Sequence, residues 1–160
     1  MTLQSMSNQV MAGLMQQNLE YKGALSEELT AALQSGLTQQ EGCVVLQTLA
    51  HSAGGYSPAL HFDKTGYECL VNHVHIDPVA GEDERQPLRM GLAYAQKLTE
   101  ILQNSGYRQC FQIIVSFHLT DQICTVRFHT KRPGEHWLAD DLEQYREEAI
   151  QVIRLDSNQI

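Results

Sequence analysis

The feature of the sequence that most constrains the fold is a pair of neighbouring segments with apolar side chains at every second position. The first segment spans residues 110–118 and the second spans residues 123–130. Alternation with a period of two places the apolar side chains on one face of a β-strand. The short link around Thr120 and Asp121 then predicts an antiparallel hairpin. Its apolar positions are Phe111, Ile113, Val115 and Phe117, followed by Cys124, Val126 and Phe128.

Segments on both sides of this hairpin are predicted to complete a layered fold. Residues 59–77 are rich in β-forming side chains around a turn at residues 63–66, which predicts a second hairpin. Residues 87–104 and 141–155 carry apolar side chains at helical spacing, so each predicts an amphipathic helix. The order after residue 56 is then β-β-α-β-β-α. We therefore predict an α+β fold, in which an antiparallel four-stranded sheet has its helices packed on one face.

Helical patterns also occupy the N-terminal third of the chain. Residues 2–21 predict one amphipathic helix, and Ser26 is placed to begin a second. The T-x-x-E capping box that starts at Thr38 predicts a third helix. The glycines at positions 54 and 55 end this run, so the chain is predicted to comprise a helical N-terminal segment, residues 1–55, and an α+β domain, residues 56–160. If the chain forms a homodimer, the N-terminal helices are the expected contact.

The charge balance restricts the classes of partner. The chain has a formal net charge of −8, with 11 Lys and Arg residues against 19 Asp and Glu residues. A nucleic-acid binder needs a basic face for the phosphates, so we expect no nucleic-acid partner and favour a basic protein partner. The N-terminus lacks the features of a signal peptide, and no apolar run is long enough to span a membrane. A cytoplasmic protein with no membrane partner is therefore expected.

His73, His75 and Asp77 are the sharpest candidates for chemistry. Alternate positions on a strand would place the three side chains on one side, where they could hold a metal ion in a small metal-dependent hydrolase. The H-x-H-x-D-H segment of metallo-β-lactamase-type hydrolases looks similar, but Pro78 stands where that pattern has its next histidine. The interpretation with greater weight is that these are polar side chains on the solvent or partner face of a strand. The four cysteines are scattered and are expected to be reduced and buried, without a zinc site.

A second group of candidates follows the last predicted strand. Basic side chains alternate on its outward face, continue into a Pro-Gly turn and are followed by the only tryptophan. Because arginine and tryptophan are enriched at interface hot spots, this group predicts a docking surface. A solvated strand face carries equal weight, and a lone tryptophan more often packs in a core. The residues are Arg127, His129, Lys131, Arg132, Glu135 and Trp137.

The sequence carries no positive signal for catalysis. It contains no G-x-S-x-G segment, no glycine-rich phosphate loop and no cysteine with a convincing histidine partner. We therefore expect a protein that is not an enzyme and that uses no cofactor.

Several stretches together resemble bacterial polymorphic-toxin immunity proteins, and the closest family is the Immunity protein 10 family. The resemblance covers roughly residues 58–153 and leaves the first 55 or so residues outside it. The stretches are GYEC (66–69), VNHVHID (71–77), CTVRFH (124–129), RPGE (132–135), WL (137–138) and DDLE (140–143).

This resemblance implies a small cytoplasmic protein that binds one cognate toxin domain, delivered by a neighbouring cell through contact-dependent or type VI routes, and blocks its active site. It carries over no catalytic residue and no defined contact residue. The toxin-binding residues that we predict from the patterns above are His73, His75, Arg127, His129, Lys131, Arg132, Glu135 and Trp137. The N-terminal segment outside the resemblance is an alternative contact.

Overall fold

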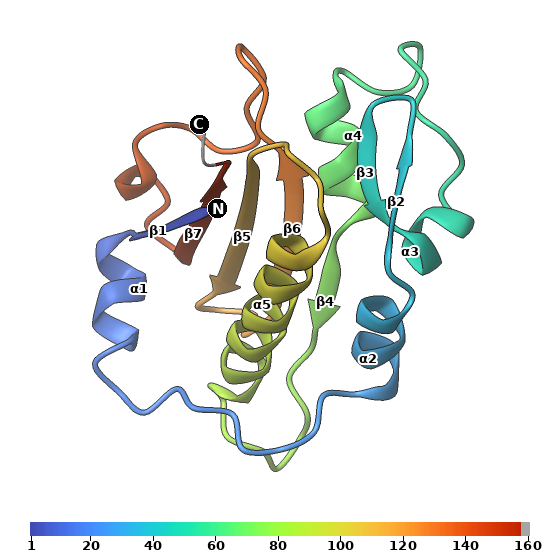
Figure 1. The fold of residues 1–160 in the computed structure, drawn as a ribbon. Coiled ribbons are helices and arrows are strands. Elements are labelled where there is room, and N and C mark those ends of the chain that lie inside the picture. The colour runs from blue at the N-terminus through green and yellow to red at the C-terminus, as the bar shows by residue number, and fades with distance from the viewer. Residues whose placement is uncertain (158–160) are drawn as a thin grey trace.

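The main sheet contains five strands, all paired antiparallel, in the spatial order β1-β7-β5-β6-β4. The computed structural model describes residues 1–157. Figure 1 shows this sheet through the middle of the molecule, with β1 at one edge and β4 at the other. The strands are β1 (Thr2–Ser7), β4 (Val74–Ile76), β5 (Phe111–His118), β6 (Cys124–Thr130) and β7 (Glu148–Asp156).

Helix α5 (Gln86–Asn104) covers one face of the main sheet (Figure 1). Leu98 on its apolar stripe is fully buried, together with the alternate side chains of β5 and β6. Ile113 of β5 lies opposite Phe128 of β6, so the predicted hairpin is confirmed, and so is the helix predicted over residues 87–104. In the part of the chain that the structure describes, no helix combines the length and apolar character needed to cross a bilayer.

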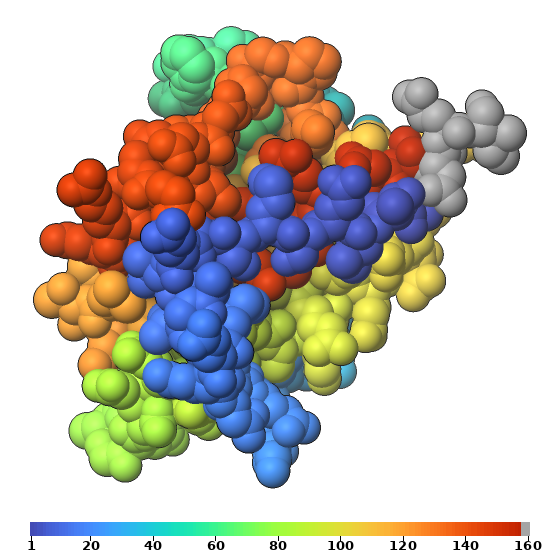
Figure 2. All heavy atoms as spheres, turned by 90° about the vertical axis from the view of Figure 1, so that its left-hand side faces the viewer, coloured from blue at the N-terminus to red at the C-terminus, as the bar shows by residue number. Residues whose placement is uncertain are grey.

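The N-terminal residues form an edge strand, so the long helix predicted over residues 2–21 is wrong. β1 pairs along its whole length with β7, and only α1 (Gln9–Leu14) is helical there. The Asn8 side chain joins the two ends of the chain, since its Oδ1 accepts from the N–H groups of Met11 and Ile150, both at 3.0 Å. Figure 2 shows β1, in dark blue, lying along the red residues of β7. A partner strand from the far end of the chain outweighs the local helical spacing.

Residues 37–46 form a separate two-stranded antiparallel sheet where the capping box predicted a helix. Glu41 (φ 52°) and Gly42 (φ 78°) both have positive φ, as the central residues of a two-residue hairpin turn do. The turn therefore overrides the T-x-x-E pattern. The strands are β2 (Leu37–Gln40) and β3 (Cys43–Leu46), and α3 (Gln47–His51) follows them.

The short helix predicted to begin at Ser26 is present as α2 (Glu27–Gln34), and Ser26 Oγ accepts from the Leu29 N–H at 3.3 Å. The dimer contact expected through the N-terminal helices loses its longest predicted helix, since residues 2–7 belong to the main sheet.

The hairpin predicted over residues 59–77 is also wrong. Its longer predicted strand is mostly helix α4 (Lys64–Val71), and only β4 remains extended. Asp63 caps the helix, with its Oδ1 accepting from the Gly66 N–H at 2.7 Å. The β-forming side chains that suggested a strand, such as Tyr67, are buried on the inner face of this helix instead. The cap and the burial together outweigh the β propensity of the segment.

The final helix predicted over residues 141–155 is replaced by a single 3₁₀ turn (Leu142–Gln144) and by β7. β7 lies between β1 and β5, so both of its edges are paired. The predicted four-stranded sheet preceded by a helical segment is therefore wrong. Within residues 1–157 the fold is α+β, with a five-stranded antiparallel main sheet, a separate two-stranded sheet and five α-helices.

Candidate functional site

His73 and His75 lie together at the β4 edge of the main sheet. Their ring centroids are 4.7 Å apart, and His75 Nδ1 lies 3.4 Å from Thr125 Oγ1 on β6. Burial lowers the pKa of His73. Among residues 1–157, no group of three or more His, Cys, Asp or Glu side chains is placed to hold a metal ion, so Asp77 does not complete a ligand set with the two histidines.

Arg127 and Trp137 form a cation–π pair on the face of the sheet opposite α5. The guanidinium carbon of Arg127 lies 4.6 Å from the centroid of the indole ring, a cation–π distance. Arg127 Nη1 also donates to the Cys69 carbonyl at 3.4 Å. Trp137 is 37% exposed, so the ring that contacts Arg127 also remains partly accessible to solvent.

Arg132 is held by a buried carboxylate. Its Nη1 and Nη2 donate to the two oxygens of Glu68 at 2.9 and 2.8 Å, and Glu68 has no exposed side-chain area. Arg132 Nη2 also donates to the Gly42 carbonyl at 3.0 Å. Arg132 Nε lies 3.7 Å from a Glu135 oxygen, which in turn accepts from Thr65 Oγ1 at 2.9 Å. Two of the predicted toxin-binding residues, Arg132 and Glu135, are thus engaged in holding the turn after β6 to α4.

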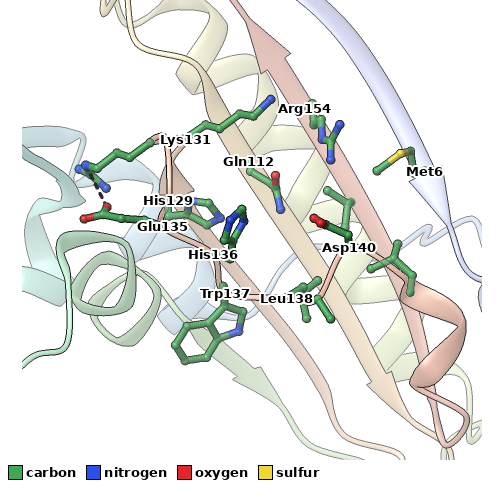
Figure 3. A pocket seen from close by; sticks show the side chains of 14 residues that line it. Met6, Gln112, His129, Lys131, Glu135, His136, Trp137, Leu138, Asp140 and Arg154 are labelled. Atoms are coloured by element: carbon green, nitrogen blue, oxygen red, sulfur yellow. Dashed lines mark ion pairs between the residues drawn. The ribbon is translucent and has the colours of Figure 1, made fainter.

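The face of the main sheet opposite α5 carries a pocket of about 270 Å³ beneath residues 131–142 (Figure 3). β1, β5, β6 and β7 contribute to its floor, and residues 131–142 contribute to its walls. The pocket brings together five of the predicted toxin-binding residues, namely His129, Lys131, Arg132, Glu135 and Trp137. The other three, His73, His75 and Arg127, do not line it.

The floor of the pocket contains a polar row that crosses three strands. His129 on β6 is paired with Gln112 on β5, and Gln112 is paired with Arg154 on β7. Directly opposite residues in antiparallel strands have Cβ atoms about 5 Å apart on the same face. Figure 3 shows the side chains of His129, Gln112 and Arg154 together in the lining of the pocket. In a neighbouring row, Ile114 of β5 is paired with Arg127 on one side and with Val152 on the other.

Two polar atoms in this row, His129 Nε2 and Arg154 Nε, are buried and have no hydrogen-bond partner among residues 1–157. His129 is 2% exposed, and its Nδ1 lies 2.9 Å from the Thr130 carbonyl oxygen. Because a carbonyl oxygen only accepts, Nδ1 carries the proton, and Nε2 of the neutral ring is an acceptor. Burial lowers the pKa of His129 and so favours this neutral form.

Stability is expected to fall as pH decreases from about 7 to about 5, and His129 is expected to contribute to this fall. Its pKa is lower in the folded protein than in the unfolded chain, so the unfolded chain binds a proton that the folded protein does not. The stabilising contribution is therefore present above the unfolded pKa and is lost as pH falls. Urea unfolding of His129→Phe across this range should show a shallower pH dependence than the wild-type protein. The exposed His51→Phe serves as the control, and equal slopes for all three proteins would contradict the expectation.

A second unusual surface is the turn of residues 57–62. Phe62 is 101% exposed and Leu60 is 81% exposed, although both are large apolar residues. The backbone beneath them is ordered by hydrogen bonds, because the N–H groups of Leu60 and His61 donate to the Ser57 carbonyl at 3.0 and 2.9 Å. The His61 ring packs edge-on against Tyr67 of α4, with centroids 4.9 Å apart. The turn therefore presents two apolar side chains from an anchored backbone.

Sequence reasoning missed Gln112, Arg154, Leu60 and Phe62. Gln112 is a polar position on the exposed side of a correctly predicted strand, so alternation alone could have identified it. Arg154 was hidden because its segment has the spacing of a helix, and register with β5 is what places it beside Gln112. Leu60 and Phe62 belong to a segment predicted as a strand, in which residues two apart share one face, so that prediction gave no reason to expect both side chains in water.

No curated protein and no solved structure matches the chain significantly. Residues 6–160 match the model described as the Uncharacterized protein PM0498 family. This match does not connect the chain with the Immunity protein 10 family, so that resemblance remains a prediction from the sequence. Because the match covers nearly the whole chain, the chain belongs to the Uncharacterized protein PM0498 family.

Proposed function

We propose that this chain is a toxin-neutralising binding protein that docks on its partner through the turn of residues 57–62. The observation that carries the proposal is the exposure of Phe62 (101%) and Leu60 (81%) on one turn. Large apolar side chains that remain in water have a favourable free energy available from burial against a partner. A small number of such anchors supplies most of the affinity in typical protein interfaces.

The base of the turn supports a role in docking because it is already ordered. The Tyr56 and His61 rings stack with centroids 5.8 Å apart, and the Tyr67 hydroxyl donates to the Gly54 carbonyl at 2.6 Å. A preorganised turn loses little conformational entropy when it binds, so more of the burial energy appears as affinity.

Two further observations support a toxin domain as the partner. The net charge of −8 favours association with a basic protein, such as a toxin with a basic cleft. The resemblance to the Immunity protein 10 family implies that the toxin is neutralised in the cytoplasm of the cell that makes this chain. The eight residues predicted from the sequence to touch the toxin remain a prediction, although His129 is 2% exposed and Arg132 is paired with Glu68 and Glu135 within the fold.

The test is co-expression with the product of the neighbouring gene, followed by measurements of cell survival and of copurification. The wild-type chain is expected to protect the cells and to copurify with that product. The double variant with Leu60→Ala and Phe62→Ala is expected to bind about 30-fold more weakly or worse, with an unchanged thermal midpoint. Fold stability should not change because both side chains already lie in water.

Val79→Ala is the matched control. Val79 is 58% exposed and lies in the segment between β4 and α5. The substitution therefore removes a comparable exposed apolar group at a site away from the turn. Absence of protection by the wild-type chain would refute the toxin as partner. Full affinity of the double variant would refute the turn as the docking site.

A further inference from the structure

We infer that the pocket beneath residues 131–142 binds a small hydroxycarboxylate, with its carboxylate near Arg154 and Lys131 and its hydroxyl donating to His129 Nε2. This site is separate from the docking turn, whose residues do not line the pocket. The inference therefore goes beyond the proposed function and does not depend on it.

The need for a hydrogen-bond donor comes from His129. His129 lines the pocket, and its Nε2 is buried without a partner among the described residues, while Nδ1 is occupied by the Thr130 carbonyl. An unpaired buried acceptor costs free energy, which a donor on a bound molecule would offset. Since the neutral ring offers only an acceptor on this side, the matching group is a hydroxyl or another donor.

The need for an anion comes from the charges around the pocket. Arg132 is already paired with Glu135 and with Glu68. None of the salt bridges between described residues involves Lys131, Arg154 or Asp140, which all line the pocket. Within residues 1–157, Lys131 and Arg154 thus supply two cations without a salt bridge against the one carboxylate of Asp140, while Arg132 with its two carboxylates adds a charge of −1, so the whole group is balanced. A carboxylate placed between Lys131 and Arg154 would pair with cations that have no salt bridge to a described residue, whereas a phosphate dianion would add twice the negative charge to a balanced group.

The apolar side chains in the lining indicate the chemistry of the remaining part of the ligand. Met6, Leu138, Leu142 and Val152 contribute side chains to the lining, and the volume of about 270 Å³ limits the ligand to a small molecule. Figure 3 shows Leu138 on the opposite side of Gln112 from Lys131, so a ligand that spans Gln112 would meet a cation on one side and an apolar side chain on the other. A carboxylate with a short hydrocarbon chain fits this division.

Isothermal titration of the purified full chain with two matched probes tests the inference. The probes are 2-hydroxy-4-methylpentanoate and 4-methylpentanoate, which differ only in the hydroxyl group. We expect the hydroxylated probe to bind about tenfold more tightly or better, because only this probe satisfies His129 Nε2. Inorganic phosphate is expected to bind more weakly than the hydroxylated probe.

Two variants separate the roles of the polar groups. Arg154→Met should weaken binding of both probes about tenfold, since it removes the charge and keeps the apolar stem. Arg108→Met at an exposed position outside the pocket is the matched control and should leave both affinities unchanged. His129→Phe should abolish the difference between the two probes. If His129→Phe does not fold, the wild-type comparison and Arg154→Met still decide the question.

Three results would overturn the inference. Equal affinity of the wild-type protein for the two probes would show that no donor is recognised. Tighter binding of phosphate would show a different ligand class. Lack of binding by the hydroxylated probe at about 10 mM would show that the pocket is not a site for this chemistry.

Discussion

Replacing Glu68 with alanine is expected to lower the free energy of unfolding by about 3–5 kcal/mol. Glu68 is fully buried and accepts from both terminal nitrogens of Arg132. It also accepts from the N–H groups of Val44 on β3 and Thr130 on β6, each at 2.7 Å. Removal of the carboxylate leaves a partly buried guanidinium and two strand N–H groups without their acceptor.

The effect should be large because α4 joins two strand edges that do not pair with each other. Four residues after Glu68, Asn72 accepts from the Leu46 N–H at 2.9 Å and donates to the Val44 and Phe128 carbonyls at 2.9 and 3.3 Å. Glu68 and Asn72 therefore satisfy backbone groups of β3 and of β6 from one face of one helix. Loss of Glu68 should loosen the small sheet from the main sheet.

Urea unfolding monitored by the fluorescence of Trp137 measures this effect. Glu100→Ala, on the exposed surface of α5, is the matched control and should change stability by less than about 0.5 kcal/mol. Arg132→Met should also be destabilising, but the double variant with Glu68→Ala should lose less than the two single losses added together, because the unpaired charge is gone. A loss below about 1 kcal/mol for Glu68→Ala would contradict the role assigned to this pair.

Replacing Gly91 with alanine is expected to destabilise the protein by about 1–3 kcal/mol, through overpacking between α5 and β6. A Cβ at Gly91 would overlap Cys124 Sγ and would lie 3.5 Å from Val126 Cγ2. Cys124 and Val126 are fully buried, so their side chains have little room to move. Helix propensity alone would favour alanine by about 1 kcal/mol, so the sign of the change distinguishes the two effects.

Thermal and urea unfolding of three further proteins make this test specific. Gly13→Ala in α1 is the matched control, because a Cβ there has nothing within 4 Å, and it should be neutral or stabilising. Adding Cys124→Ala to Gly91→Ala should restore most of the stability that Gly91→Ala loses relative to Cys124→Ala alone. If Gly91→Ala stabilises the protein, the close contact between α5 and β6 does not constrain this position.

The elements that were predicted correctly are those whose partners are close in the sequence. The hairpin of β5 and β6, helix α5 and the cap at Ser26 each follow from spacing within one segment. β1 and β7 were predicted as helices because their apolar residues also recur at intervals of three and four. Their pairing joins the two ends of the chain, and no local pattern reports such a contact.

The residues of the candidate pocket also divide into those that a local sequence pattern located and those that only contacts distant in the sequence bring together. The alternation placed Arg127 and His129 correctly on one face of β6, while Lys131 lies just after the end of the strand. Gln112 and Arg154 complete the polar row only through the register of β5 with its two neighbours. The assignment of Arg132 to a buried pair with Glu68 depends on a helix that the sequence pattern presented as a strand.

The sequence by itself determined the acidic balance, the central hairpin, the long helix that covers it and the face on which the basic side chains of β6 lie. These properties follow from composition and from periodicity over fewer than about 20 residues, so they survive in any arrangement of the rest. The tertiary structure alone decided the strands at both ends of the chain, the neutral buried His129 and the pairing of Arg132. Strand edges and buried charges must find partners wherever the chain supplies them, and here most of those partners are distant in the sequence.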